Sequence, residues 1–289
     1  EADIISQGLE RCDTMLTANP PEHSKYKRIA MHALPLKRVM AMTPYITEVT
    51  NDLIDIFIAD GKVNFKSKFA EMLPSIVIAD ALGIPREDIP MFKRWVNAAI
   101  LRLNGNAKPE DRPNLARSEI EMQQYFIGLM DERRDAPGDD IISDLVQASL
   151  PVDGSERPLT DAEIYSIIQQ IFTAGQEATA HALTYALAQL IAHPEQLQDV
   201  IDDPDLAANM VEETVWHLSP SHNMWRVVHE DTELGGVALK KGEPMLIRYG
   251  SANRDEGKFE HACQYDVHRD NAKTLTYFMQ PICLLNADG

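Results

Sequence analysis

The stretch from Thr160 to Pro194 reads TDAEIYSIIQQIFTAGQEATAHALTYALAQLIAHP and carries the strongest secondary-structure signal in the chain. It opens with a capping box, in which the Thr160 hydroxyl and the Glu163 carboxylate satisfy each other's backbone amides. No proline interrupts it before Pro194, so the pattern predicts one helix about 50 Å long at 1.5 Å per residue. Apolar residues occur around most of its circumference, which is typical of burial on several sides.

The middle of this helix reads Ala174-Gly-Gln-Glu-Ala-Thr179, an unusual composition for a helix interior. A glycine there costs about 1 kcal/mol relative to alanine, and a buried carboxylate needs a partner. Two interpretations are equally compatible with the spacing. Either Gly175 marks a tight crossing of two helices with Glu177 in solvent, or a ligand packs against the glycine.

The segments on both sides of the long helix are mostly helical in pattern. Further helices are predicted over 39–58, 69–82, 91–103, 118–133 and 205–218. Turn-forming residues predict loops over 135–140 and 151–158. Three β-like runs, separated by glycine-containing turns, follow at 225–228, 233–239 and 245–249. The sequence therefore predicts a mainly α fold with a small β-sheet region near the C-terminal end.

The composition limits the classes of function. The chain has 289 residues, with 27 Lys and Arg against 45 Asp and Glu, a net charge of −18. This balance argues against nucleic-acid binding, which needs a basic face to neutralise phosphates. Three scattered cysteines form no disulfide framework or metal pair and favour a reducing compartment. No apolar run reaches the ~20 residues of a membrane helix, so we expect a cytoplasmic protein without a membrane partner.

A set of motifs, in one order along the chain, resembles the bacterial soluble cytochromes P450. The matching segments are 20–28, 172–179, 211–220, 234–242, 250–255 and 259–271. They are similar to the family's C helix, the oxygen-binding part of its long central I helix, its K helix, a sheet with the helix after it, and the meander before the cysteine loop. The resemblance implies a single P450-like domain over 1–289, truncated at both the N- and C-terminus relative to the family.

The resemblance implies a haem b cofactor with the thiolate of Cys283 on the iron, because Cys283 falls near the position of the family's axial ligand. Such a thiolate pushes electron density toward the iron and favours O–O cleavage. Ala174 and Gly175 would line the cofactor, and Glu177 and Thr179 would act in catalysis. The family's propionate-binding positions correspond to His23, Lys27, Arg226 and His268.

The resemblance also implies a small hydrophobic substrate and an electron donor. The apolar side chains expected to face the substrate are Ile168, Ile171 and Phe172. In the family the C-helix side faces an acidic ferredoxin, and opposite charges speed such an encounter. The basic residues on that side are Lys25, Lys27, Arg28, Lys37 and Arg38. A solvated helix face accounts for the same cluster, so both interpretations stay open.

Several positions differ from the family pattern. Ala178 follows Glu177 where the family has threonine, and the glycines around the cysteine are absent from residues 277–286. The family's K-helix glutamate bridges two arginines, whereas here the matching residues are Glu213, Trp216 and Gln264. A buried carboxylate that loses its guanidinium costs several kcal/mol. We therefore expect the surroundings of Glu213 to be repacked about the Trp216 indole.

These observations leave more than one functional hypothesis. The first is a haem-thiolate monooxygenase. The second is a haem-free protein with the same fold that binds a ligand or assists another enzyme, and it is motivated by the differences at Ala178, Trp216, Gln264 and the cysteine loop. The third is a non-oxidative enzyme that uses Glu177 as an acid or base in the same pocket.

Overall fold

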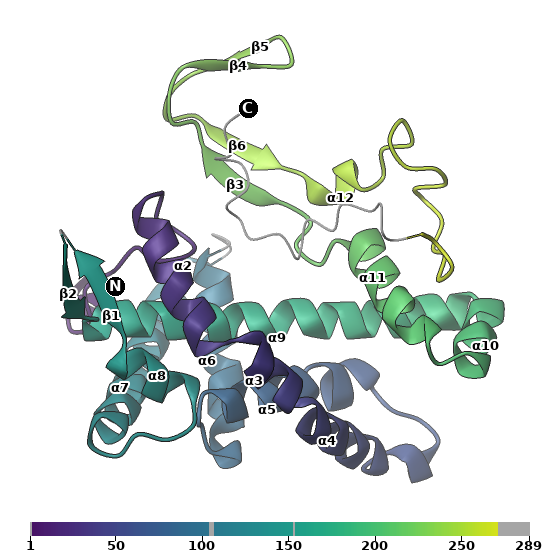
Figure 1. The fold of residues 1–289 in the computed structure, drawn as a ribbon, viewed down its shortest axis with the longest axis horizontal. Helices are drawn as coiled ribbons and strands as arrows, with labels where there is room; N and C mark the ends of the chain where they lie inside the picture. Colours follow the sequence, from purple (N-terminus) through teal and green to yellow (C-terminus); the bar gives the residue numbers. More distant parts are fainter. Residues whose placement is uncertain (1, 104–106, 153, 271–289) are drawn as a thin grey trace. The chain divides into compact units, whose positions relative to one another are not determined.

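A computed structural model of the chain describes residues 2–103, 107–152 and 154–270 (Figure 1). Its α-helices are α1 (Ala2–Ile5), α2 (Glu22–Ala33), α3 (Leu36–Ala41), α4 (Thr43–Asp55), α5 (Met72–Ala81), α6 (Ile89–Leu103), α7 (Arg112–Asp135), α8 (Ile141–Gln147), α9 (Asp161–Ala192), α10 (Pro194–Asp202), α11 (Leu206–Leu218) and α12 (Tyr249–Ala252). Short 3₁₀ turns occupy Ile58–Asp60 and Arg86–Asp88, and a π turn occupies Lys66–Ala70. The strands are β1 (Ser149–Val152), β2 (Ser155–Pro158), β3 (Met224–Val227), β4 (Thr232–Leu234), β5 (Val237–Leu239) and β6 (Pro244–Ile247).

The predicted long helix is confirmed as α9, which runs without a break in Figure 1. The capping box forms at its start, where the Thr160 amide donates to Glu163 Oε2 at 2.8 Å and the Glu163 amide donates to Thr160 Oγ1 at 3.3 Å. Its N-terminal half is buried, whereas Ile191 near the other end is 65% exposed. Burial on several sides therefore holds for the first half of the helix only.

Most of the other predicted helices are confirmed, as α5, α6, α7 and α11. The single helix predicted over 39–58 is wrong, because the structure has two helices, α3 and α4, that meet at Met42. Pro44 lies in the first turn of α4, where its missing N–H costs nothing. The loop predicted over 151–158 is also wrong. There β1 and β2 form an antiparallel hairpin, and Gly154 adopts a φ of 79° that favours glycine.

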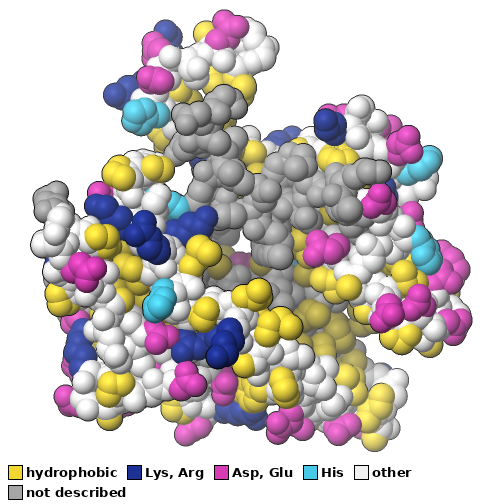
Figure 2. Space-filling model, in the orientation of Figure 1, with side chains coloured by type: hydrophobic (Ala, Val, Ile, Leu, Met, Phe, Trp, Pro, Cys, Tyr) yellow, Lys and Arg dark blue, Asp and Glu magenta, His cyan; other side chains and the backbone are white. Residues whose placement is uncertain are grey.

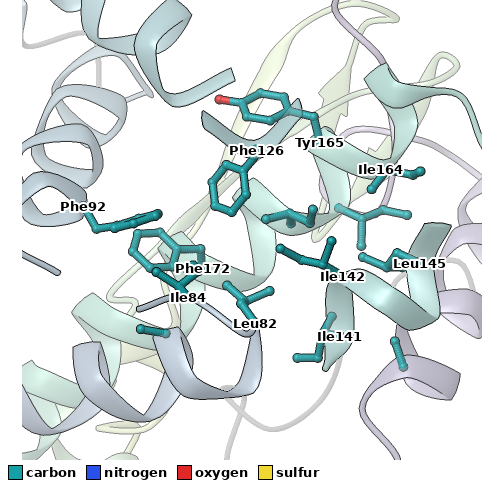
Figure 3. Packing of buried hydrophobic residues seen from close by; sticks show 14 of the residues in the cluster. Leu82, Ile84, Phe92, Phe126, Ile141, Ile142, Leu145, Ile164, Tyr165 and Phe172 are labelled. Carbon is teal, nitrogen blue, oxygen red and sulfur yellow. The ribbon is translucent and has the colours of Figure 1, made fainter. Parts of the chain in front are cut away.

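The chain divides within α9 into two compact units, Glu1–Glu177 and Ala178–Gly289. In the first unit, α5 to α9 enclose a hydrophobic core in which Phe92, Phe126 and Phe172 lie together (Figure 3). These three rings are at most 1% exposed. Apolar burial of this kind dominates the stability of a helical unit.

In the second unit, the β-like runs form two separate antiparallel ladders. β3 pairs with β6, with Trp225 opposite Leu246, and β4 pairs with β5. The predicted runs at 225–228 and 245–249 are confirmed as β3 and β6. The run predicted over 233–239 is instead a hairpin of two strands, because Gly235 and Gly236 make the β4–β5 turn with φ values of 57° and 81°. The prediction of a single domain over 1–289 stays a prediction. Among the described helices, none combines the length and apolar character needed to cross a membrane.

Candidate functional site

The middle of α9 has one buried and one open side. Phe172 and Gln176 are buried on one side, and Gln176 Nε2 donates to the hydroxyl of Ser75 on α5. On the other side, Ala174 and Glu177 are exposed. Ala174 and Glu177 therefore form an accessible strip of α9 among the described residues.

Gly175 makes an ordinary contact with a neighbouring helix. A Cβ built on Gly175 would lie 3.6 Å from Ile78 Cδ1 on α5, which is a normal van der Waals distance. Packing among the described residues therefore does not demand glycine at this position. The described contacts therefore do not support the interpretation that Gly175 marks a tight crossing of two helices.

This geometry predicts the effect of Gly175→Ala. Alanine is the better helix former, and among the described residues its methyl group would make an ordinary contact with Ile78, so we expect the free energy of unfolding to rise by about 0.5–1 kcal/mol. Urea unfolding followed by circular dichroism measures the change. A loss of 1 kcal/mol or more would instead support the tight crossing.

The other predicted α9 residues lie in different environments. Thr179 is exposed and Ala178 is half-buried. Ile168 and Phe172 are completely buried in the core of the first unit, and Ile171 packs partly against that core. Their proposed contact with a substrate stays a prediction, as does the catalytic role of Thr179.

His23 and Lys27 lie one turn apart on α2. The His23 side chain is buried, and burial, together with the Lys27 cation, lowers the pKa of its imidazole below the ordinary value. Lys27 is half-buried. A neutral imidazole beside an ammonium group offers an anion one hydrogen-bond donor and one charge, which suits a carboxylate such as a propionate.

Arg226 and His268 belong to the second unit. Arg226 is half-buried on β3 and donates from Nη1 to the Trp225 carbonyl at 2.9 Å. His268 is exposed, and its Nε2 lies 2.9 Å from Asp199 Oδ2 on α10. Hydrogen bonding to Asp199 raises the pKa of His268 above its ordinary value. A propionate at His268 would have to compete with that carboxylate.

Cys283, the predicted axial ligand, lies outside the described residues. Cys12 is half-buried and Cys263 is exposed. Within the described ranges, no group of three His, Cys, Asp or Glu side chains is arranged to hold a metal ion.

Glu213 on α11 has a partner that the sequence analysis missed. Its side chain is completely buried and receives two hydrogen bonds, from Arg269 Nε at 2.9 Å and from the Asp266 amide at 3.0 Å. Burial raises the pKa of Glu213, although the amide and the guanidinium oppose the shift. The expectation that Glu213 has no guanidinium partner is therefore wrong. The signal for Arg269 was available, because it is the only arginine after Arg254.

The Trp216 indole lies next to the Glu213–Arg269 pair. The indole is completely buried, and the Phe259 ring meets it edge-on with centroids 5.5 Å apart. The Arg269 guanidinium carbon lies 4.5 Å from the centre of the indole ring, a cation–π contact. Gln264 is exposed, and its backbone carbonyl accepts from Arg269 Nη2 at 2.7 Å.

A second polar pair of α11 was also missed. The hydroxyl of Tyr185 on α9 lies 2.6 Å from His217 Nδ1, and His217 Nε2 lies 3.3 Å from the Cys263 carbonyl. A carbonyl only accepts, so Nε2 carries the proton and Nδ1 accepts from the phenol. Burial lowers the pKa of His217, which agrees with this neutral form.

The predicted basic cluster on α2 and α3 divides into two groups. Figure 2 shows Lys and Arg side chains over these helices, next to hydrophobic ones. The Arg38 guanidinium forms ion pairs within the protein, with Asp139 at 2.9 Å and with Asp144 on α8. Lys25 pairs with Glu22 at 3.0 Å. Arg28 and Lys37 are exposed, so these two are better placed to meet a partner.

Comparison with known proteins decides the family. The sequence profile of cytochrome P450 matches residues 5–276. The chain belongs to the cytochrome P450 family. It is 32% identical over 263 residues to the 6-deoxyerythronolide B hydroxylase of Saccharopolyspora erythraea, which covers 91% of this chain and 63% of that protein. The predicted family and its mainly α fold are thereby confirmed.

Solved cytochrome P450 structures have the same fold as this chain. P450BioI, in complex with a fatty-acid-ligated acyl carrier protein, superposes with a TM-score of 0.84 at 29% identity, over 91% of this chain and 67% of that one. CYP109E1 from Bacillus megaterium, in complex with testosterone, gives a TM-score of 0.79 at 28% identity, over 93% and 72%. The chain spans 62–66% of the length of the first curated P450 relatives that it matches. The family implies a haem-thiolate cofactor in general.

Proposed function

We propose that the chain belongs to a haem-thiolate monooxygenase that acts on a small hydrophobic substrate. The observation that carries this proposal is the family match over residues 5–276 together with the open strip of α9 at Ala174 and Glu177. The related hydroxylase and the testosterone-bound relative support a hydrophobic substrate. When bound, the haem b would supply the activation of dioxygen, with the Cys283 thiolate favouring O–O cleavage.

The chain's own residues have separate tasks in this proposal. Ala174 and Gly175 leave room for the flat cofactor along α9. Glu177 holds and transfers a proton at its exposed carboxylate, with Thr179 as a second proton-transfer group. In the first unit, His23 and Lys27 would bind an anionic group of the cofactor. In the second unit, the residues proposed for this task are Arg226 and His268. Ile171, which is only partly buried, provides the apolar side toward the substrate, whereas Ile168 and Phe172 pack inside the core of the first unit.

We further propose an acidic electron-donor protein as the partner of the α2–α3 surface. Arg28 and Lys37 provide the accessible positive charge on a chain whose net charge is −18. Opposite charges raise the association rate, and salt screens this effect. The related P450BioI binds an acyl carrier protein, so a relative of this fold does take a protein partner. A ferredoxin fits this description.

Reconstitution with haem tests the proposed function. We expect purified protein with added haem to give the reduced CO difference spectrum of a thiolate-ligated haem. Cys283→Ala should abolish that band, and Cys263→Ala, at an exposed cysteine, should keep it. A featureless haem titration, or an unchanged band in Cys283→Ala, would overturn the proposal and favour the haem-free alternative.

A further inference from the structure

His217 on α11 lies where three parts of the second unit meet, and its side chain is only 7% exposed. The Tyr185 ring on α9 stacks on the imidazole with ring centroids 5.9 Å apart. The Tyr265 ring meets the imidazole edge-on at 5.8 Å, and the Cys263 carbonyl lies 3.3 Å from Nε2. The imidazole is therefore covered by α9 and by residues 263–265.

Only the neutral imidazole satisfies both of its hydrogen bonds. Nε2 donates to the Cys263 carbonyl, so Nδ1 must accept from the Tyr185 hydroxyl at 2.6 Å. A second proton, on Nδ1, would remove the acceptor that the Tyr185 phenol uses. It would also place a positive charge in a buried site, which is costly unless a negative group pairs with it.

The charged groups around His217 do not supply that negative partner. Arg254 donates to the His217 carbonyl at 2.8 Å. Glu213, one turn earlier on α11, already accepts from Arg269 Nε at 2.9 Å. Burial is the main cause that lowers the pKa of His217 below its ordinary value of 6.5, and the charges of Arg254, Arg269 and His193 add to it.

We propose that His217 is an acid-sensitive contact between α9, α11 and residues 261–267, and that a proton on Nδ1 favours a state in which this segment has moved off the imidazole. Residues 261–267 form turns, without helix or strand, in the described structure. Such a segment opens more readily than the helices α9 and α11. The proposal goes beyond the monooxygenase function and holds with or without a cofactor.

The sign of the pH effect follows from the lowered pKa of His217. The imidazole takes up a proton near pH 6.5 once it is exposed to water, but only at lower pH while it is buried. Acid therefore stabilises the open state, and the contact loses stability as the pH falls below 6.5. Each unit of difference between the two pKa values changes the opening equilibrium about tenfold.

Two other groups on these segments titrate with the opposite sign. Burial raises the pKa of Glu213, and hydrogen bonding to Asp199 raises the pKa of His268. When folding raises a pKa, the folded state favours the protonated form, so its stability increases as the pH falls. Neither Glu213 nor His268 therefore accounts for a loss of protection in acid.

Hydrogen exchange of the full chain, measured by mass spectrometry and corrected for the intrinsic pH dependence of amide exchange, tests the proposal. We expect protection in peptides covering 261–267 to fall about threefold or more between about pH 7.5 and about pH 5. In His217→Phe, which keeps a ring but cannot titrate, this pH dependence should disappear. His229→Gln, at an exposed histidine of the same unit, is the matched control and should keep the wild-type fall. An equal fall in His217→Phe, or no fall in the wild type, would overturn the proposal.

A titration of the histidine imidazoles by nuclear magnetic resonance gives a second measurement that does not need His217→Phe to fold. We expect His217 in the wild type to titrate below pH 6.5. Tyr185→Phe removes the donor that holds Nδ1 unprotonated, so the pKa of His217 should rise and the loss of protection should begin at a higher pH. An unchanged His217 titration in Tyr185→Phe would contradict the role of the phenol in this contact.

Discussion

Phe92→Ala is expected to lower the free energy of unfolding by about 3–5 kcal/mol, the usual cost of removing a fully buried phenylalanine ring. Phe92 on α6 is 1% exposed and contacts the rings of four other aromatic residues. The centroid distances are 5.0 Å to Trp95, 5.1 Å to Tyr125, 5.7 Å to Phe126 and 4.9 Å to Phe172. Truncation removes apolar burial and leaves a cavity that the surrounding helices cannot fill completely.

Urea unfolding monitored by circular dichroism measures this loss. Leu101→Ala is the matched control, because Leu101 lies on the same helix but is 43% exposed; its expected effect is below about 1 kcal/mol. If Phe92→Ala prevents folding, Phe92→Leu keeps most of the volume and should cost about 1–2 kcal/mol. Equal effects of Phe92→Ala and Leu101→Ala would contradict this account of the core.

Glu163 gives the second large effect, as a dependence of stability on acidity. Burial alone would raise its pKa, but hydrogen bonds from Arg157, the Thr160 amide and the Tyr26 hydroxyl outweigh burial and lower the pKa to about 2. Both Arg157 contacts and the Tyr26 contact are 2.7 Å long. The Glu163 carboxylate, at the start of α9, therefore accepts hydrogen bonds from residues on α2 and on strand β2 of the same unit.

The sign of the pH effect follows from the lowered pKa. The unfolded chain takes up the proton near pH 4.5 and the folded one only near pH 2, so the ionised carboxylate stabilises the fold fully above pH 4.5. That contribution, about 3 kcal/mol, is lost as the pH falls from 4.5 toward 2. The difference in unfolding free energy between wild type and Glu163→Gln should shrink accordingly.

Urea titrations at several pH values between 6 and 2.5 check this prediction. Asp231→Asn is the control, because Asp231 pairs with Lys240 on an exposed surface. Its difference from wild type should stay small at every pH, since solvent screens exposed ion pairs. A wild-type advantage over Glu163→Gln that does not change with pH would refute the assignment.

The sequence alone determined the elements whose signals are local. The capping box and the unbroken 3.6-residue pattern determined α9, and the paired glycines determined the β4–β5 turn. The order of motifs along the chain was enough to indicate the cytochrome P450 family. Where local signals misled, a tertiary or positional effect was responsible: Pro44 began a new helix inside an amphipathic pattern, and β1 found a partner in β2 despite turn-forming residues.

Only the tertiary structure decided which side chains meet. Arg269 and Glu213 are 56 residues apart, and no periodicity connects them. The same holds for Tyr185 with His217 and for Arg38 with Asp144. The position of a residue in a helical pattern indicates which face of the helix is apolar. The partner of a buried charged side chain is instead a donor or acceptor that folding brings within about 3 Å of it. That choice depends on packing between distant segments, which a linear pattern does not contain.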